Sequence, residues 1–212
     1  MTDRPLTIFL VPAGDHRVAT AHSVLVNLRD VPAPTRVWTA DVTNSGMPDA
    51  PYAAVVAGEA AALRPLLAAF SPREIAAAAR RFKDDTTADD NGCVEGVSIL
   101  SFIAAYPDVD RVETVRRWRE HAPLALEIHH AARRYVQYEL LDGLDGEPGY
   151  AGMANLHLPD VEALATGMFR TEADVTVIAA DVARFVHHHD TFLAHEHALG
   201  DDGMGSDSQD KE

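Results

Sequence analysis

Hydrophobic and polar positions in the first half of the chain predict alternating strands and helices. Continuous apolar runs predict strands at residues 6–11, 35–42 and 52–57. Apolar residues at helical spacing predict helices at residues 16–29 and 60–70. Residues 71–82 begin with Ser-Pro-Arg-Glu, which is typical of a helix start, so we expect a further helix there. The polar, acidic residues 84–92 predict a loop that joins the two halves.

The second half repeats this plan more clearly. Apolar runs predict strands at residues 97–104, 133–140, 150–158 and 191–199. Helical spacing predicts helices at residues 111–129, 161–169 and 174–187. Glycine and proline punctuation predicts loops at residues 44–51 and 142–149.

The order strand, helix, strand, strand, helix, strand is that of the ferredoxin-like unit. Such a unit covers one face of its sheet with helices, so the other face must pack on a second sheet. A doubly wound parallel sheet is disfavoured, because the loops have hairpin length and no glycine-rich phosphate turn follows a strand. We predict an α+β protein in which two ferredoxin-like halves, residues 1–92 and 93–199, form a dimeric α/β-barrel-type protein with a disordered acidic tail at 200–212.

Charge and composition narrow the class of partner. The formal net charge of -15 disfavours a nucleic-acid partner, because phosphate backbones would be repelled. No apolar run reaches the roughly 20 residues of a membrane helix, and residues 6–11 are too short for a signal-peptide core. Cys93 is the single cysteine, so no intrachain disulfide can form. We therefore expect a cytoplasmic protein with no membrane partner.

The predicted helix at 111–129 holds the most informative candidate, His121. Its core stripe consists of Val115, Trp118, Ala122 and Ala125, and His121 lies at the margin of that stripe. A histidine there can be partly buried and can titrate near neutral pH. Pro123 lacks an N–H and leaves one helix carbonyl without its partner. Spacing alone fits both a boundary histidine with structural contacts and a proton-transfer group on a pocket floor.

The same helix resembles the signature of the EthD family of dimeric α/β-barrel proteins. The matching segment is Val-Arg-Arg-Trp-Arg-Glu-His-Ala-Pro-Leu at residues 115–124. The strand Arg-Tyr-Val-Gln at 134–137 and the run Asp-Val-Ala-Arg-Phe-Val at 181–186 add to the resemblance, which covers about residues 97–199. The first half looks like a diverged copy without a counterpart of His121, so the resemblance implies one active pocket per chain.

The resemblance implies a cofactor-independent acid/base enzyme with His121 as its catalytic residue. The expected reaction is a dehydration, decarboxylation or isomerisation, that of a lyase or isomerase, on a small cyclic, polyketide-like or aromatic-derived compound. Three alternatives stay open: a non-catalytic accessory protein that binds a hydrophobic small molecule, a cofactor-free monooxygenase, and a haem-binding relative. We expect a homodimer, no bound cofactor and no metal.

Further residues on the predicted elements are candidates for binding the substrate: Trp118, Tyr135, Tyr138, Asn155, His195 and His197. Tyr135 and Tyr138 fall on opposite faces of their strand, where cross-strand packing is the alternative role. His195 and His197 share one strand face and could line a pocket. A metal held by these two histidines with a nearby carboxylate is the weaker alternative.

Overall fold

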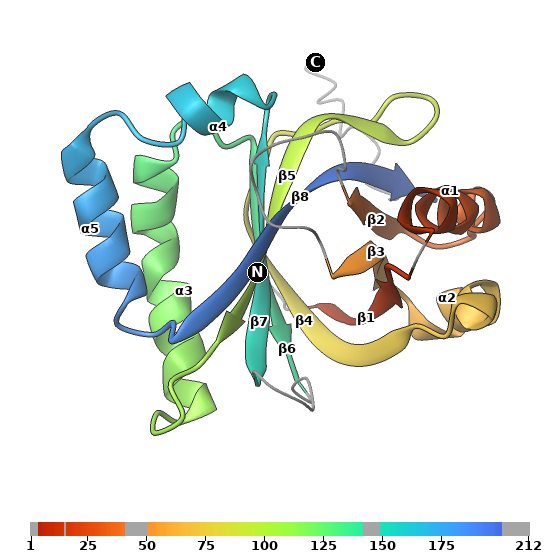
Figure 1. Cartoon of the computed structure of the whole chain (residues 1–212), viewed down its shortest axis with the longest axis horizontal. Coiled ribbons are helices and arrows are strands. Elements are labelled where there is room, and N and C mark those ends of the chain that lie inside the picture. Colours follow the sequence, from red (N-terminus) through yellow and green to blue (C-terminus); the bar gives the residue numbers. More distant parts are fainter. Residues whose placement is uncertain (1–3, 15, 41–50, 142–148, 201–212) are drawn as a thin grey trace, which may run out of the picture.

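A computed structural model describes the chain except for residues 1–3, 15, 41–50, 142–148 and 201–212 (Figure 1). The elements follow in the order β1 (Arg4–Pro12), α1 (Arg17–Leu28), β2 (Thr35–Ala40), β3 (Tyr52–Gly58), α2 (Ala60–Leu67), a 3-10 turn (Ala68–Phe70), β4 (Arg73–Asp84), β5 (Cys93–Ala104), α3 (Arg111–Ile128), β6 (Arg134–Leu140), β7 (Tyr150–Leu158), α4 (Glu162–Thr166), α5 (Glu172–Val182) and β8 (His188–Leu199).

The strands form a closed antiparallel barrel in the order β1-β3-β2-β8-β5-β7-β6-β4. Strands β1 to β4 are neighbours in the order β4-β1-β3-β2, and strands β5 to β8 repeat that order as β8-β5-β7-β6. Two ladders join the halves, one between β2 and β8 and one between β4 and β6. The fold is therefore α+β, with the barrel closed within a single chain.

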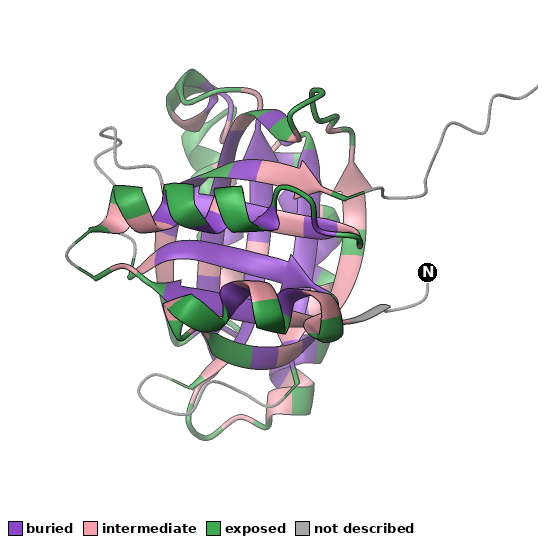
Figure 2. Cartoon of the chain, turned by 90° about the vertical axis from the view of Figure 1, so that its right-hand side faces the viewer, coloured by how far each residue is buried: buried purple, intermediate pink, exposed green. Residues whose placement is uncertain are grey.

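Along each strand, side chains point alternately into the barrel interior and outward toward the helices. The interior contains aliphatic and aromatic residues of all eight strands, among them Ile8, Trp38, Val55, Ile75, Phe102, Tyr138, Met153 and Phe192. The outer face of β1, β2 and β3 packs on α1 and α2, and that of the last four strands packs on α3, α4 and α5 (Figure 1). Figure 2 shows the exposed faces of α1 and α2 above the buried strands. The helices thus form layers on opposite sides of the barrel.

The structure corrects the element predicted at 71–82. Residues 73–82 lie in β4, a strand paired with both β1 and β6, rather than in a helix. Alanine favours helices when its neighbours do not decide the conformation. Here Ile75 and Ala77 point into the barrel, and the two flanking strands supply backbone partners that outweigh this preference. The strand is also the element that completes the first half of the barrel.

The remaining predicted helices and strands are confirmed with small shifts of their ends. The closing strand begins at His188, three residues earlier than expected, and the helix predicted at 174–187 ends at Val182. The loops predicted at 44–51 and 142–149 lie mostly outside the described residues, as does the tail at 200–212 beyond Gly200. None of the described helices is both long and apolar enough to cross a lipid bilayer.

Candidate functional site

Helix α3 presents the predicted catalytic histidine on its buried side. The helix begins after Asp110, whose side chain accepts a hydrogen bond of 2.9 Å from the backbone N–H of Val112. Trp118, His121 and Ala122 are all buried on the face toward the barrel and α5. The apolar stripe predicted from the sequence is therefore the packed face, and His121 lies within its margin with 7% of its surface exposed.

His121 forms a hydrogen-bonded pair with Asp181 of α5. Nδ1 of His121 lies 2.8 Å from Oδ2 of Asp181, and Nη1 of Arg184 donates to Oδ1 of the same carboxylate at 2.7 Å. A carboxylate only accepts hydrogen bonds, so Nδ1 carries a proton in this contact. The Phe185 ring lies 5.3 Å from the imidazole, measured between ring centres. In the described part of the chain no residue is hydrogen-bonded to Nε2, which makes that nitrogen the basic atom of neutral His121.

The electrostatics keep His121 neutral and Asp181 ionised. Burial lowers the pKa of His121 below its ordinary value, and the hydrogen bond and charge of Asp181 oppose this effect only in part. Burial raises the pKa of Asp181, but the hydrogen bonds from His121 and Arg184 outweigh it and lower that pKa. At neutral pH the pair is therefore an imidazole held by a carboxylate, an arrangement suited to accepting a proton.

Trp118 of α3 packs on the outer face of the sheet, and Tyr135 of β6 points outward from the same face. The side-chain nitrogen of Gln137 donates to the backbone oxygen of Trp118 at 2.8 Å and to Oη of Tyr135 at 3.0 Å. Burial raises the pKa of Tyr135 to about 12, so its hydroxyl remains protonated. The cavity beside Trp118 and Gln137 has a volume of about 10 Å³, enough for about one water molecule. Trp118 and Tyr135 thus share the layer of His121.

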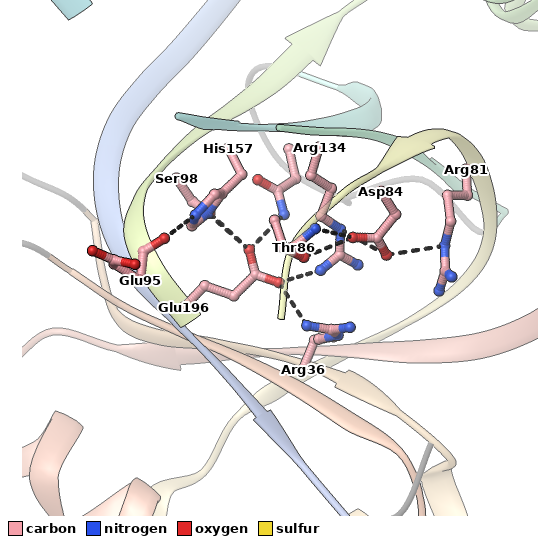
Figure 3. Close-up of polar contacts among 10 residues, drawn as sticks. Arg36, Arg81, Asp84, Thr86, Glu95, Ser98, Arg134, His157 and Glu196 are labelled. Carbon is pink, nitrogen blue, oxygen red and sulfur yellow. Dashed lines mark hydrogen bonds and ion pairs between the residues drawn. The ribbon is translucent and has the colours of Figure 1, made fainter. Parts of the chain in front are cut away.

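Tyr138 and Asn155 lie instead inside the barrel, near a network centred on Glu196 of β8. Figure 3 shows the polar contacts around Glu196. Glu196 is fully buried and forms ion pairs with Arg134 and, at 3.3 Å, with Arg36. Its Oε2 also accepts hydrogen bonds from Ser98 at 2.9 Å and from Asn155 at 3.2 Å. The sheet separates these residues from His121, so the structure does not bring them into one site.

The Glu196 network continues to His157 and to the bulge near the start of β5. The Nδ1 atom of His157 lies 3.0 Å from Oγ of Ser98, and its Nε2 lies 2.9 Å from the backbone oxygen of Glu95. That contact needs Gly96, which has φ +121° and approaches His157 so closely that a Cβ would lie 2.6 Å from its Nε2. The bulge in β5 therefore shapes one end of the interior.

Charge balance keeps Glu196 ionised in this setting. Burial raises the pKa of its carboxyl, but the hydrogen bond of His157 and the charges of Arg134 and Arg36 lower that pKa strongly below its ordinary value. Arg134 also lies 3.8 Å from Asp84, measured from Nε to Oδ2. A buried carboxylate with this many partners fits a structural role as well as a functional one.

His195 and His197 lie on the outer face of β8. His197 lines an open groove of about 710 Å³ between α1, the turn at residues 88–93 and the end of β8, and Cys93 lies opposite it on β5. Burial and the neighbouring His195 lower the pKa of His197. Within the described ranges no three histidine, cysteine or acidic side chains come together as a metal site. The predicted site residues therefore fall into three separate places.

Sequence reasoning missed the groups that contact the predicted residues most directly. Asp181 lay in the segment matched at 181–186, but nothing in its spacing distinguished it from a solvated helix carboxylate. Arg134 and Glu196 were both on predicted strands, on faces now known to be interior. A charged residue on an otherwise apolar strand face is the one signal that could have indicated the network.

Comparison with known proteins agrees with the fold. Residues 106–189 match the model of the EthD domain family. A proposed monooxygenase from Lactobacillus acidophilus NCFM has a TM-score of 0.55 and 10% identity, with 94% of this chain and 98% of that chain covered. An anthrone oxidase-like protein has a TM-score of 0.55 and 8% sequence identity, with 93% of each chain covered.

A mutant chlorite dismutase from Candidatus Nitrospira defluvii has a TM-score of 0.53 and 12% identity, with 92% of each chain covered. Among curated proteins, comparison of sequences finds no match to this chain. At these identities the similarity to the solved structures shows a shared fold, and the roles of individual residues have to be argued from this chain.

Proposed function

We propose that this protein, whose residues 106–189 match the EthD domain model, is a cofactor-independent enzyme that transfers a proton on a small organic molecule. The finer proposal is a lyase or isomerase that dehydrates, decarboxylates or isomerises a cyclic, polyketide-like or aromatic-derived compound. The structural neighbours described as a proposed monooxygenase and an anthrone oxidase-like protein support a small-molecule enzyme of this general class.

One observation carries the proposal: the pair of buried His121 and partly exposed Asp181 leaves Nε2 of a neutral imidazole without a protein partner among the described residues. A base of this kind removes an acidic proton from a carbon next to a carbonyl and returns it at another position. A positioned general base contributes about 10²–10⁴ in rate. Trp118 and Tyr135 lie in the same layer and are proposed to border the substrate.

Access to this base is limited. His121 is only 7% exposed, so the substrate must approach through this small exposed part or through movement of α3 and α5. Tyr138 and Asn155 cannot contact the same substrate from inside the barrel. We propose that His195 and His197 belong to a separate ligand-binding surface, because they lie on the outer face of β8.

The haem-binding alternative does not fit the residues present. His121 offers an imidazole nitrogen, but it is only 7% exposed and packs against Asp181 and Phe185, which leaves little space for a porphyrin beside it. The groove at His197 is larger, but it is open and carries the carboxylates of Asp30, Asp89 and Asp90 on its lining. An anionic, mostly apolar porphyrin is poorly matched by such a lining. No step of the proposed reaction passes through haem.

Anthrone, a tricyclic ketone with an acidic C–H, is a suitable probe of proton transfer. Exchange of that proton in deuterated water is followed by NMR with wild-type protein, His121→Asn and the exposed-site control His16→Asn. We expect His121→Asn to lose about two orders of magnitude in rate while His16→Asn keeps it. Equal exchange by wild-type protein and His121→Asn would contradict the role of His121.

A second candidate function, binding of a hydrophobic small molecule without turnover, is favoured by the groove of about 710 Å³. Its wall includes Leu25 and Val26, and Val26 is 58% exposed. A fluorescence titration with Nile red should show weaker binding by Val26→Asp than by wild-type protein. Val18→Asp on the same helix is the matched control, because Val18 is also exposed but does not line the groove. Equal loss in both variants would place the dye elsewhere.

We also propose that residues 1–92 and 93–199 are two ferredoxin-like halves and that the protein is a homodimer. The repeated strand order supports the two halves. Val177, nearly half exposed on α5, offers an apolar contact for a second copy. Sedimentation equilibrium of wild-type protein and Val177→Lys tests the dimer, since a lysine there should shift the population toward monomer.

A further inference from the structure

Helix α5 is held at both ends so that Asp181 faces α3. Its start is fixed by a capping box between Thr171 and Asp174 and by Arg170, which donates to the backbone oxygen of Glu127 at 2.7 Å. At its end, Tyr106 donates to the backbone oxygen of Ala183 at 2.9 Å. The carboxylate thus comes from an element anchored on both sides of His121.

The carboxylate itself is held from its far side. Arg184, one turn after Asp181, donates to Oδ1 at 2.7 Å and leaves Oδ2 for His121. Arg117 of α3 donates to the backbone oxygen of Arg184 at 2.7 Å, which ties this turn to the helix that carries His121. The two oxygens of Asp181 therefore have different and fixed partners.

We propose that Asp181 is a positioning residue: its Oδ2 holds the Nδ1–H tautomer of His121, so that Nε2 keeps the lone pair that accepts the substrate proton. The proposal rests on the proposed function of His121 and adds a group that does not contact the substrate. Without Asp181 the neutral ring would distribute its proton over both nitrogens, and part of the population would present Nε2–H, which cannot act as a base.

The charged groups around His121 allow the effect of Asp181 to be isolated. Asp181 faces it from α5, and Arg184 in the turn after α5 is paired with Asp181. On α3 itself Arg117 is paired with Glu113, and Glu120 is paired with Arg116. His129, further along α3, has a pKa lowered mainly by burial and slightly by His121. Loss of the Asp181 charge should therefore be the largest single electrostatic change at the imidazole.

The test is ¹⁵N NMR of histidine-labelled full-length protein without substrate. The signals of His121 are assigned as those absent from His121→Asn, and their shifts report which ring nitrogen is protonated. We expect Nδ1–H with bare Nε2 in wild-type protein at neutral pH, and a mixture of tautomers in Asp181→Leu. A wild-type ring protonated at Nε2 would overturn the proposal without any variant.

A second measurement keeps the proposal falsifiable if Asp181→Leu does not fold. Asp181→Asn keeps an acceptor for Nδ1 but removes the charge, so the titration midpoint of His121 should fall by about one pH unit. Glu172→Gln removes an equal charge from the start of α5 and is expected to leave the midpoint unchanged. Equal midpoints in wild-type protein and Asp181→Asn would also overturn the role of Asp181.

Failure of the proposed function and failure of this inference are distinguishable. If His121→Asn retains the exchange of anthrone, the base has been assigned to the wrong residue, whatever the tautomer. If His121→Asn loses exchange but the tautomer is independent of Asp181, the base stands and the positioning role is wrong. Both the base role of His121 and the positioning role of Asp181 are supported if Asp181→Asn moves the acid limb of the pH–rate profile of anthrone exchange to lower pH, together with the titration midpoint of His121.

Discussion

Arg134 of β6 and Glu196 of β8 form an ion pair through the interior of the barrel, although β5 and β7 separate their strands in the sheet. Both side chains are almost completely buried. Arg36 reaches the same carboxylate from β2, so the pair also connects the two halves of the chain. A contact of this kind makes the stability of the whole barrel depend on one carboxylate.

Replacing Glu196 with glutamine should destabilise the protein strongly. The substitution leaves the buried Arg134 and the partly exposed Arg36 without their shared counter-charge, and removal of one partner from a buried pair costs about 3–5 kcal/mol. The free energy of unfolding in urea measures the effect. Glu74→Gln is the matched control, because Glu74 pairs with the exposed Arg64 and should matter little. Similar losses in both variants would show that the barrel interior is not water-excluded.

Gly152 of β7 marks the contact between α3 and the sheet. A Cβ at this position would lie 2.2 Å from the ring of Trp118, so Gly152→Ala forces the ring away from its place. We expect a loss of about 1–3 kcal/mol in stability from this overpacking. Gly149→Ala, which has open space around its Cβ position, should be neutral in the same urea titration. A neutral Gly152→Ala would mean that Trp118 is loosely packed.

The sequence predicted most of the fold because hydrophobic period and turn residues are local signals. The stripe of α3 and the alternation of Tyr135 and Tyr138 on β6 both follow from spacing. Burial confirms the stripe, and the packing of Tyr135 outside the barrel and of Tyr138 inside it confirms the alternation. The segment at 71–82 failed because four consecutive alanines carry no period, and only pairing with β1 and β6 decides their conformation.

The candidate site was less accessible to sequence reasoning. His121 could be singled out from its place on a helix, but Asp181 is 60 positions away and meets it only through the packing of α5 on α3. Tyr138 and Asn155 have the residue types of a binding site, yet the closed barrel places them on the opposite side of the sheet. Which of these residues belong to one site therefore depends on the packing of the elements in space, which residue types along the chain do not reveal.

The stability of the folded protein should decrease as the pH falls below about 6.5, the ordinary pKa of histidine. Burial is the main cause that lowers the pKa values of His121, His129 and His197 in the folded protein. In the unfolded chain the histidine pKa values are about 6.5, so below that pH the unfolded chain binds protons that the folded protein does not. The stabilising contribution of these three imidazoles is therefore present above about pH 6.5 and is lost as the pH falls toward their pKa values in the folded protein.

Thermal melts at pH 7.5, 6.5 and 5.5 test this dependence, because the carboxyl groups of Glu196 and Asp181, whose pKa values are lowered, stay ionised throughout that range. The melting temperature should be nearly constant between the first two values and lower at the third. His121→Asn should show a smaller drop than wild-type protein, whereas His16→Asn, at an exposed position, should show the wild-type drop. A wild-type melting temperature that rises on acidification would contradict burial of these imidazoles in neutral form.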